Sequence, residues 1–187
     1  MKKHISIIDF GAGNLHSVYK AFKYIGADVE ITKDPNVIEK SDAVVFPGVG
    51  AFGAVMRSIK KNNLQDILIR SAAKPFLGIC MGLQVLFESS EENPEEAGLG
   101  VFKGKVVRFK AAKKVPHIGW NDAGGKKYYF VHSYYVVPED NSIIYGETEY
   151  DGEKFTSVIK KDNLLAVQFH PEKSGDAGLE LLRMFIK

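Results

Sequence analysis

The chain has 187 residues, with 25 Lys and Arg against 23 Asp and Glu, and one cysteine, so its formal net charge is +2. This length suits one domain, which we expect to span residues 1–187 with a core that needs no disulfide, and the small charge excess gives no argument for nucleic-acid binding. The lone cysteine fits a reducing compartment, and the sequence has no stretch of ~20 apolar residues. We therefore expect a soluble, cytoplasmic protein with neither a secretory leader nor a membrane segment.

Strand-like and helix-like segments alternate through the first half. An apolar run at 5–10 leads into a glycine turn at 11–14, after which apolar residues recur at helical spacing up to Ile25, and Gly26 supplies a stop. Further strand-like runs occupy 28–32, 42–46 and 75–79, and a helical stretch covers 64–73. This alternation predicts a parallel sheet with helices on both faces.

The second half reads mainly as short strands. They occupy 101–109, 128–137, 142–150, 155–160 and 164–169, and the turns at 140–143 and 151–154 have the composition of hairpin connections. Leu179, Leu182 and Ile186 predict a closing amphipathic helix. We therefore predict an α/β fold whose mostly parallel sheet carries an antiparallel β extension in the second half.

Cys80 lies in GICMG at 78–82, directly after an apolar strand and before a helical pattern. Two flanking glycines allow the tight strand-to-helix turn that holds a nucleophile in a strained, exposed position. The N–H groups at the start of the following helix favour a thiolate. Most free cysteines are small core residues. The turn nevertheless favours a nucleophile here.

His170 and Glu172 lie in QFHPEK at 168–173, at the end of the last apolar strand. On an extended backbone, residues two apart point the same way, so the carboxylate would sit beside the imidazole and fix its tautomer. Pro171 favours such an extended segment.

A glycine turn, PGVG at 47–50, follows another strand and would bring backbone N–H groups to a substrate oxygen. Taken alone, this turn is equally consistent with an ordinary β-turn.

These three motifs together resemble those of the class I glutamine amidotransferases. Four segments are similar to the glutaminase subunits of imidazole glycerol phosphate synthase, three of them new and the fourth an extension of the HPE motif: IIDFGAGNL at 7–15, PHIGWN at 116–121, FVHSYYV at 130–136 and QFHPEKS at 168–174. The motifs occur in the family's order over essentially the whole chain. The resemblance implies a flavodoxin-like α/β fold, with no metal or cofactor.

The resemblance also implies a role for each matching residue. Cys80 would attack the carboxamide of glutamine, His170 would shuttle the proton and Glu172 would orient His170. The remaining matches fall into three groups: an oxyanion site at Gly48, Val49 and the N–H of Met81; substrate contacts at Gln84, Ser133 and Tyr134; and positions facing the partner or its ammonia route at Asn14, His117, Trp120, Tyr129 and Lys173. The partner would be a (βα)₈-barrel cyclase subunit that uses the ammonia to build an imidazole ring.

Two features of the sequence depart from this pattern. The turn reads CMGLQ where CLGMQ is commoner, and the connection at 121–127 is shorter than the family usually shows, which leaves the geometry near Trp120 and Tyr129 open. Trp120 itself could anchor an interface or pack internally.

Three other interpretations are weaker. GAGNLH at 11–16 approaches a dinucleotide fingerprint with Glu30 on the ribose, but His16 stands where the pattern needs Gly or Ala. A non-enzymatic flavodoxin-like binding module would leave the cysteine turn and HPE unexplained. A glutaminase serving anthranilate or GMP synthesis would leave PHIGWN and FVHSYY unexplained.

Overall fold

The computed structural model describes residues 3–11 and 14–187, so Ala12 and Gly13 of the predicted glycine turn lie outside the described residues. The helices are α1 (Leu15–Tyr24), α2 (Pro35–Lys40), α3 (Phe52–Lys61), α4 (Gln65–Ser71), α5 (Met81–Gln84) and α6 (Gly175–Phe185), with short 3₁₀ turns η1 (Asn141–Ile143) and η2 (Pro171–Lys173). Among the helices of the described residues, none combines the length and apolar character needed to cross a membrane.

The strands make up one large sheet and one separate hairpin. The large sheet contains β1 (His4–Ile8), β2 (Asp28–Thr32), β3 (Ala43–Gly48), β4 (Phe76–Cys80), β5 (Ser89–Ser90), β6 (Gly104–Arg108), β9 (Tyr134–Pro138), β10 (Ile144–Tyr150), β11 (Glu153–Lys161) and β12 (Leu164–Val167). The hairpin pairs β7 (His117–Ala123) with β8 (Lys126–His132).

The order of the large sheet confirms the predicted fold class. Strands β2-β1-β3-β4-β12 run parallel, in the order of flavodoxin-like folds, and β11 then pairs antiparallel with β12. The sheet continues through β9, β6 and β5, with β10 paired to β11. The antiparallel extension therefore begins next to the last parallel strand.

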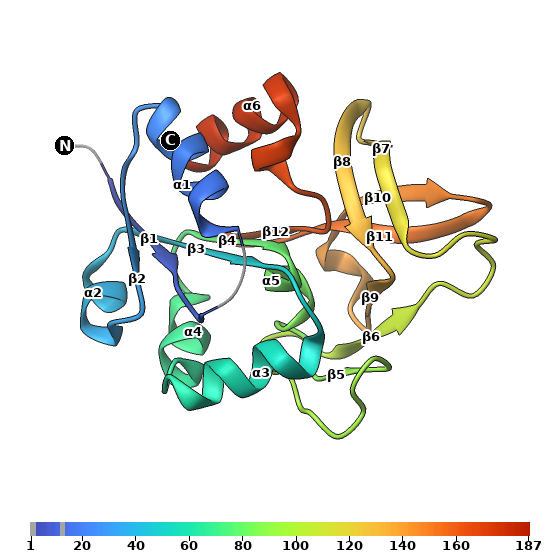
Figure 1. Cartoon of the computed structure of the whole chain (residues 1–187), viewed down its shortest axis with the longest axis horizontal. Coiled ribbons are helices and arrows are strands. Elements are labelled where there is room, and N and C mark those ends of the chain that lie inside the picture. The colour runs from blue at the N-terminus through green and yellow to red at the C-terminus, as the bar shows by residue number, and fades with distance from the viewer. Residues whose placement is uncertain (1–2, 12–13) are drawn as a thin grey trace.

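Helices cover both faces of the parallel part, as predicted (Figure 1). The strand β3 shows why: Val44 and Phe46 belong to the core beneath α2, α3 and α4, whereas Ala43 and Val45 belong to the core beneath α1 and α6. Successive side chains of a strand point to opposite faces, so a continuous apolar run serves two cores. The hairpin β7–β8 lies on the same side as α1 and α6.

Some element predictions were wrong in detail. The run at 128–137 is two strands, β8 and β9, which separate at Ser133 and belong to different sheets. The predicted hairpin at 140–143 is instead η1, because β9 and β10 both pair with β11 and not with each other. The hairpin at 151–154 is confirmed by the antiparallel pairing of β10 with β11. Helices α2 and α3 and strand β7 were not predicted.

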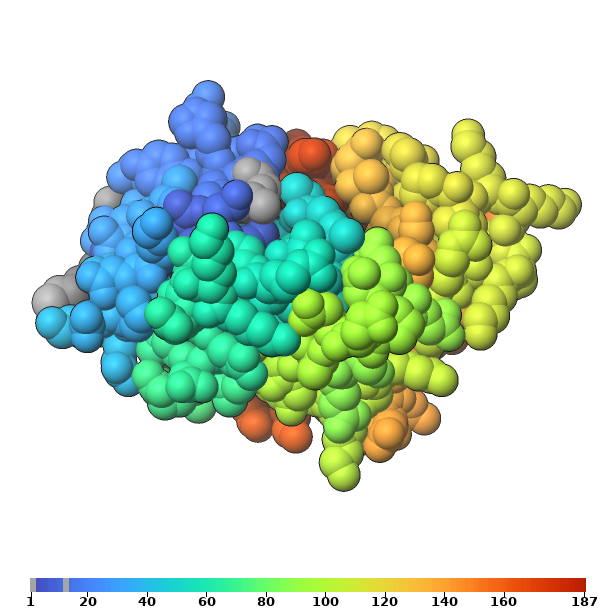
Figure 2. Space-filling view, turned by 60° about the horizontal axis from the view of Figure 1, so that its bottom comes forward, coloured from blue at the N-terminus to red at the C-terminus, as the bar shows by residue number. Residues whose placement is uncertain are grey.

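The short connection at 121–127 closes the hairpin β7–β8 in a tight turn. Ala123 pairs with Lys126, and both intervening residues are glycines with positive φ, 65° at Gly124 and 80° at Gly125. Such a two-residue turn needs positive φ at both central positions and matches the twist of the strands. In the space-filling view, the yellow part of the chain gathers at one end of the molecule and the blue N-terminal part at the other (Figure 2).

Candidate active site

The candidate residues meet at the carboxyl ends of three neighbouring parallel strands. Gly48 ends β3 and pairs with Cys80, which ends β4, while His170 follows β12 on the other side of β4. Ligands of open parallel sheets bind at this edge, because the loops that leave the strands surround it. The parallel topology therefore brings together residues that are far apart in the sequence.

Cys80 lies on a strained turn between β4 and α5. Its φ of 54° and ψ of −104° are unfavourable for a residue with a Cβ, which confirms the predicted strain. The predicted exposure was wrong, because the Cys80 side chain is buried. Gly82 has no space for a side chain, because a Cβ there would lie 1.9 Å from the carbonyl oxygen of Phe46. The glycine lets α5 begin directly against β3. The helix is shorter than predicted and ends at Gln84.

His170 and Glu172 interact as predicted, but the backbone between them differs from the predicted extended conformation. The Nδ1–H of His170 donates to Glu172 Oε1 over 2.8 Å, and only 3% of the Glu172 side chain is exposed. The segment after His170 is the 3₁₀ turn η2 and not an extended chain, since Pro171 starts the turn as its first residue. The turn is held by the Ser174 hydroxyl, which donates to the His170 carbonyl.

The electrostatic environment favours the charged form of His170. Burial lowers its pKa, but the charge and hydrogen-bonding capacity of Cys80, followed by those of Glu172, outweigh this effect and raise the pKa to about 10. Nε2 has no partner at normal hydrogen-bond geometry among the described residues, so it is the ring nitrogen left to exchange a proton. At neutral pH the imidazole therefore carries a proton on Nε2 as well as on Nδ1.

We expect the imidazole resonances of His170 to titrate near pH 10 in an NMR experiment, well above the ordinary value of 6.5. Because Cys80 is the largest favourable cause, Cys80→Ala should move this midpoint toward lower pH. His132 offers an internal reference, since burial lowers its pKa to about 3 and its signals should not move between pH 5 and 9. A midpoint unchanged by Cys80→Ala would contradict the coupling between thiol and imidazole.

A cavity of about 450 Å³ opens above Cys80. It is lined by seven of the predicted residues, namely Val49, Cys80, Met81, Gln84, Ser133, Tyr134 and Lys173, and by Gly50, Glu92, Pro116, Val131 and His132. The cavity therefore joins the glycine turn, the cysteine turn, the β8–β9 connection and η2. Its size suits a small molecule.

Two glutamine side chains connect the cavity floor to the cysteine. Gln84 Nε2 donates to the carbonyl oxygen of Tyr134 over 2.9 Å and to Gln168 Oε1 over 3.2 Å. Gln168 Nε2 in turn lies 3.6 Å from Cys80 Sγ. Both glutamines are buried, so their amide groups are fixed by these contacts.

His117 is buried, although the family resemblance implied that it faces the partner. Its ring stacks on Tyr150 and Phe130, with centroids 3.9 and 4.8 Å away, and its Nδ1 lies 3.1 Å from His132 Nε2. Burial lowers the pKa of His117 to about 4, and His132 is lowered further. Both rings are therefore neutral at pH 7, and His132 Nδ1–H donates to the Tyr134 carbonyl over 2.9 Å. His117 thus contributes to an internal network.

The other predicted partner residues have different settings. Trp120 is 58% exposed on β7 and lies opposite Tyr129 on β8, so it does not pack internally. The ammonium of exposed Lys173 lies 5.8 Å from the centre of the Tyr129 ring. Asn14 caps α1 by accepting from the N–H of Ser17 and does not line the cavity above Cys80. Trp120, Tyr129 and Lys173 therefore form one surface around the hairpin.

Sequence reasoning missed three residues near the thiol. His132 and Gln168 stand inside motifs that were singled out, FVHSYYV and QFHPEKS, but nothing local showed that they point inward. Glu92 follows β5 within an acidic run and gave no signal at all; it lines the cavity and accepts the N–H of Phe52 over 2.7 Å. Only the sheet order brings these residues to the nucleophile.

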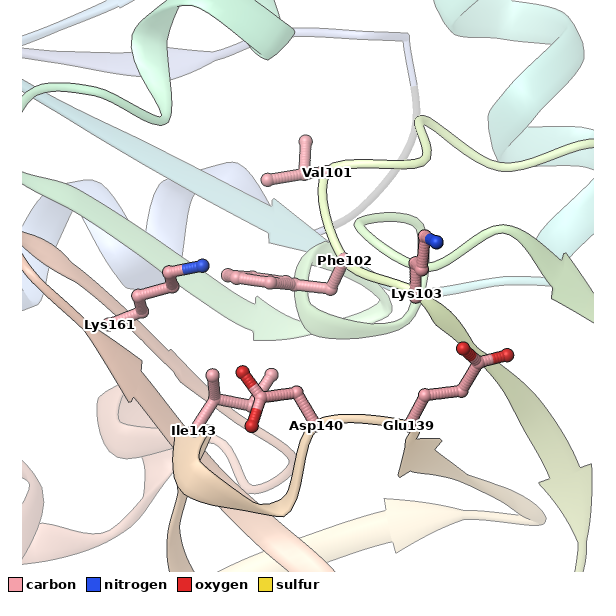
Figure 3. A pocket seen from close by; sticks show the side chains of 7 residues that line it. All are labelled: Val101, Phe102, Lys103, Glu139, Asp140, Ile143 and Lys161. Atoms are coloured by element: carbon pink, nitrogen blue, oxygen red, sulfur yellow. The ribbon is translucent and has the colours of Figure 1, made fainter.

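A second cavity, of about 350 Å³, lies beside the antiparallel extension, where Lys161 and Phe102 point toward each other (Figure 3). Its charged side chains are of both signs, Lys103 and Lys161 against Glu139 and Asp140, and its described lining contains no cysteine, histidine or serine. It therefore offers no thiol, imidazole or serine hydroxyl for catalysis. The described residues contain no group of three or more His, Cys, Asp and Glu placed to hold a metal ion.

Comparison with known proteins shows the family of this chain. The family model of the class I glutamine amidotransferases matches residues 6–187. The imidazole glycerol phosphate synthase subunit HisH of Methanothermobacter thermautotrophicus is 46% identical, covering 98% of each chain, and that of Pyrococcus furiosus is 48% identical, covering 97% of each. A crystal structure of a glutamine amidotransferase shares the fold, with a TM-score of 0.76 and 18% identity over 97% of this chain and 96% of that one. The chain therefore belongs to the class I glutamine amidotransferases and, within them, to the family of imidazole glycerol phosphate synthase HisH subunits.

Proposed function

We propose that this chain acts as one domain that hydrolyses glutamine at Cys80 and passes the ammonia to a (βα)₈-barrel cyclase subunit. The observation that carries the proposal is the arrangement of Cys80 on its strained turn, beneath a cavity, with the buried His170–Glu172 pair behind it. A nucleophile needs a proton-transfer group and an orienter, and these three side chains supply them. A reduced thiol is required, which fits a cytoplasmic location.

The first half-reaction forms a thioester. The Cys80 thiolate attacks the side-chain carbonyl carbon of glutamine, and the electron pair of the C=O bond moves to oxygen. As the tetrahedral intermediate collapses, the C–N bond breaks and the leaving nitrogen takes the Nε2 proton of His170, so ammonia departs. The raised pKa of His170 makes this proton available at neutral pH.

The second half-reaction restores the enzyme. Water attacks the thioester carbon and gives a proton to Nε2 of His170, after which the C–S bond breaks and glutamate leaves. The thiolate and the imidazolium are both regenerated, and glutamine plus water has become glutamate plus ammonia. Glu172 keeps Nδ1 protonated throughout, because its carboxylate accepts that N–H.

The oxyanion would lie between the N–H of Met81, at the start of α5, and the Gly48–Val49 peptide. These segments are adjacent because Gly48 pairs with Cys80 across the sheet, and a Cβ on Gly48 would lie only 2.7 Å from that of Met81. Two backbone donors at this point would stabilise the charge that develops on the substrate oxygen.

Polar groups in the cavity fit the rest of glutamine. Gln84 Oε1 is buried with no hydrogen-bond partner among the described residues, so it can accept an N–H of the substrate. Glu92 is the only carboxylate of the described lining and suits the α-ammonium group. Ser133 and Tyr134 would contact the substrate from the β8–β9 connection.

The cyclase would bind the hairpin surface formed by Trp120, Tyr129 and Lys173. The Trp120 indole is 58% exposed and therefore accessible to a partner, and tryptophans are enriched among the residues that dominate interface energies. Asn14 would face the same partner from the start of α1. His117 would act from inside, through its contact with His132.

The test mixes the chain with a barrel cyclase subunit, a cyclase substrate analogue and glutamine, and measures glutamate release. We expect slow hydrolysis without the partner and faster hydrolysis with it, because the Gly48–Val49 peptide would need the partner to complete the oxyanion site. Equal rates would contradict this coupling.

Trp120→Ala is expected to weaken cyclase binding by roughly 30-fold, because truncating an interface anchor costs about 2 kcal/mol. The melting temperature should change little, since the indole is largely exposed. Tyr24→Ala is a matched control, as this aromatic side chain is 74% exposed at the far end of α1 from Asn14. The affinity of each variant for the cyclase is measured by titration calorimetry. Equal affinities would show that Trp120 does not belong to the interface.

A further inference from the structure

The side chain of Gln168 is the one neutral hydrogen-bonding partner of the cysteine sulfur within the described residues. Gln168 follows β12 and has no exposed surface. Its Nε2 lies 3.6 Å from Cys80 Sγ, within hydrogen-bond range of a sulfur atom, and its Oε1 accepts from Gln84. Neither half-reaction of glutamine hydrolysis requires this contact.

The orientation of the Gln168 amide follows from its neighbours. Gln84 uses its two Nε2 protons on the Tyr134 carbonyl and on Gln168 Oε1. The Tyr134 carbonyl is itself held by the Nδ1–H of His132, whose Nε2 accepts from His117. Because Gln84 presents a donor, Gln168 must turn its oxygen toward Gln84 and its NH₂ group toward the sulfur.

We propose that Gln168 is a catalytic residue, which donates an N–H hydrogen bond to the thiolate of Cys80 and holds that sulfur in position for attack. The proposal rests on the proposed role of Cys80 as nucleophile. A donor aimed at an anion forms a stronger hydrogen bond than one aimed at a neutral thiol, so the contact favours the thiolate. The buried amide adds no charge, and it leaves Nε2 of His170 free for the leaving nitrogen.

The charged groups that face the sulfur stay in place when the amide is removed. His170 with Glu172 approaches from the segment after β12, and Glu92 and Lys173 line the cavity from the segment after β5 and from η2. A change in thiol reactivity on altering Gln168 alone would therefore report the lost hydrogen bond. Met is close to Gln in length and has no donor, so Gln168→Met preserves most of the packing.

The experiment follows the rate of Cys80 alkylation by iodoacetamide across pH, in the full chain. We expect Gln168→Met to move the acid limb of this profile upward by about one pH unit, since one unit corresponds to about 1.4 kcal/mol, the scale of a hydrogen bond to a charged group. Glutamine hydrolysis in the cyclase complex should fall about tenfold in kcat/KM. An unchanged alkylation profile would overturn the proposal.

Ser157→Ala is the matched control. Ser157 is buried on β11 beside Gln168, where its carbonyl accepts the Gln168 N–H, and its hydroxyl contacts Thr148 and not the sulfur. This variant loses a buried hydrogen bond next to the site. If the effect of Gln168→Met were merely structural, the alkylation profiles of Gln168→Met and Ser157→Ala would shift equally. We expect its alkylation profile to match that of the unaltered protein.

If the Gln168→Met variant does not fold, an NMR measurement on the unaltered protein tests the proposal. We expect the NMR resonances of the Gln168 side-chain amide protons to shift over the pH range in which the alkylation rate rises. If these resonances do not shift over that range, the proposal is overturned. The test is also independent of the proposed function. Alkylation reports the thiol whether or not it attacks glutamine, and persistent hydrolysis in Cys80→Ala would refute the nucleophile assignment while leaving the hydrogen-bond result intact.

Discussion

Replacing Cys80 with alanine is expected to reduce glutamine hydrolysis by about 10⁴-fold or more, the scale seen when a nucleophile is removed from a catalytic triad. The thioester cannot form without the sulfur, and no other cysteine exists in the sequence to replace it. His170 and the oxyanion donors would remain, but they have no covalent step to assist. Glutamate release in the presence of the cyclase subunit is the measurement.

The fold should survive this change, which makes the result interpretable. Alanine keeps a Cβ at the strained φ of 54°, so the backbone meets the same steric conditions, and only the buried sulfur is lost. Circular dichroism and cyclase binding should both match the unaltered protein. Hydrolysis close to the normal rate would show that the nucleophile lies elsewhere.

Replacing His170 with asparagine is expected to reduce glutamine hydrolysis by about 10³-fold or more. Asparagine can still meet Glu172, but it cannot deliver a proton to the leaving nitrogen. The variant also removes the positive charge that faces the sulfur. Both losses act on the first half-reaction, which should be visible as slower thioester formation in rapid-quench experiments.

His4→Asn is the control for this prediction. His4 lies on β1, makes its contacts with Asp28 and Glu30, and does not line the cavity above Cys80. It also has a raised pKa, so the comparison separates the position of a charged histidine from its mere presence. We expect its glutaminase activity to be unchanged. A loss below tenfold in His170→Asn would assign the proton transfer to another group.

The class of the fold and the position of the nucleophile were predictable because both depend on short-range patterns. Strands β3 and β4 coincide with apolar runs bounded by turn residues, and the glycines around Cys80 mark a close approach that only glycine permits. The pairing of His170 with Glu172 was also predictable, since two residues separated by one proline must lie near each other whether the backbone is extended or turned. These features were predictable because they depend on the conformations of residues close together in the sequence.

The surroundings of the thiol were decided by tertiary structure. Gln168 and Gln84 are separated by 84 positions and meet only because β12 lies beside β4. The division of 128–137 is marked only by Ser133, and a single serine between aromatic and apolar residues is too weak a turn signal to show that the chain leaves the hairpin for the large sheet. His117 sits on a strand whose alternation gives no sign of which face the core will cover, and packing placed it inside while its neighbour Trp120 stayed exposed. Burial and long-range pairing depend on the whole chain, so these contacts could be established only in the folded molecule.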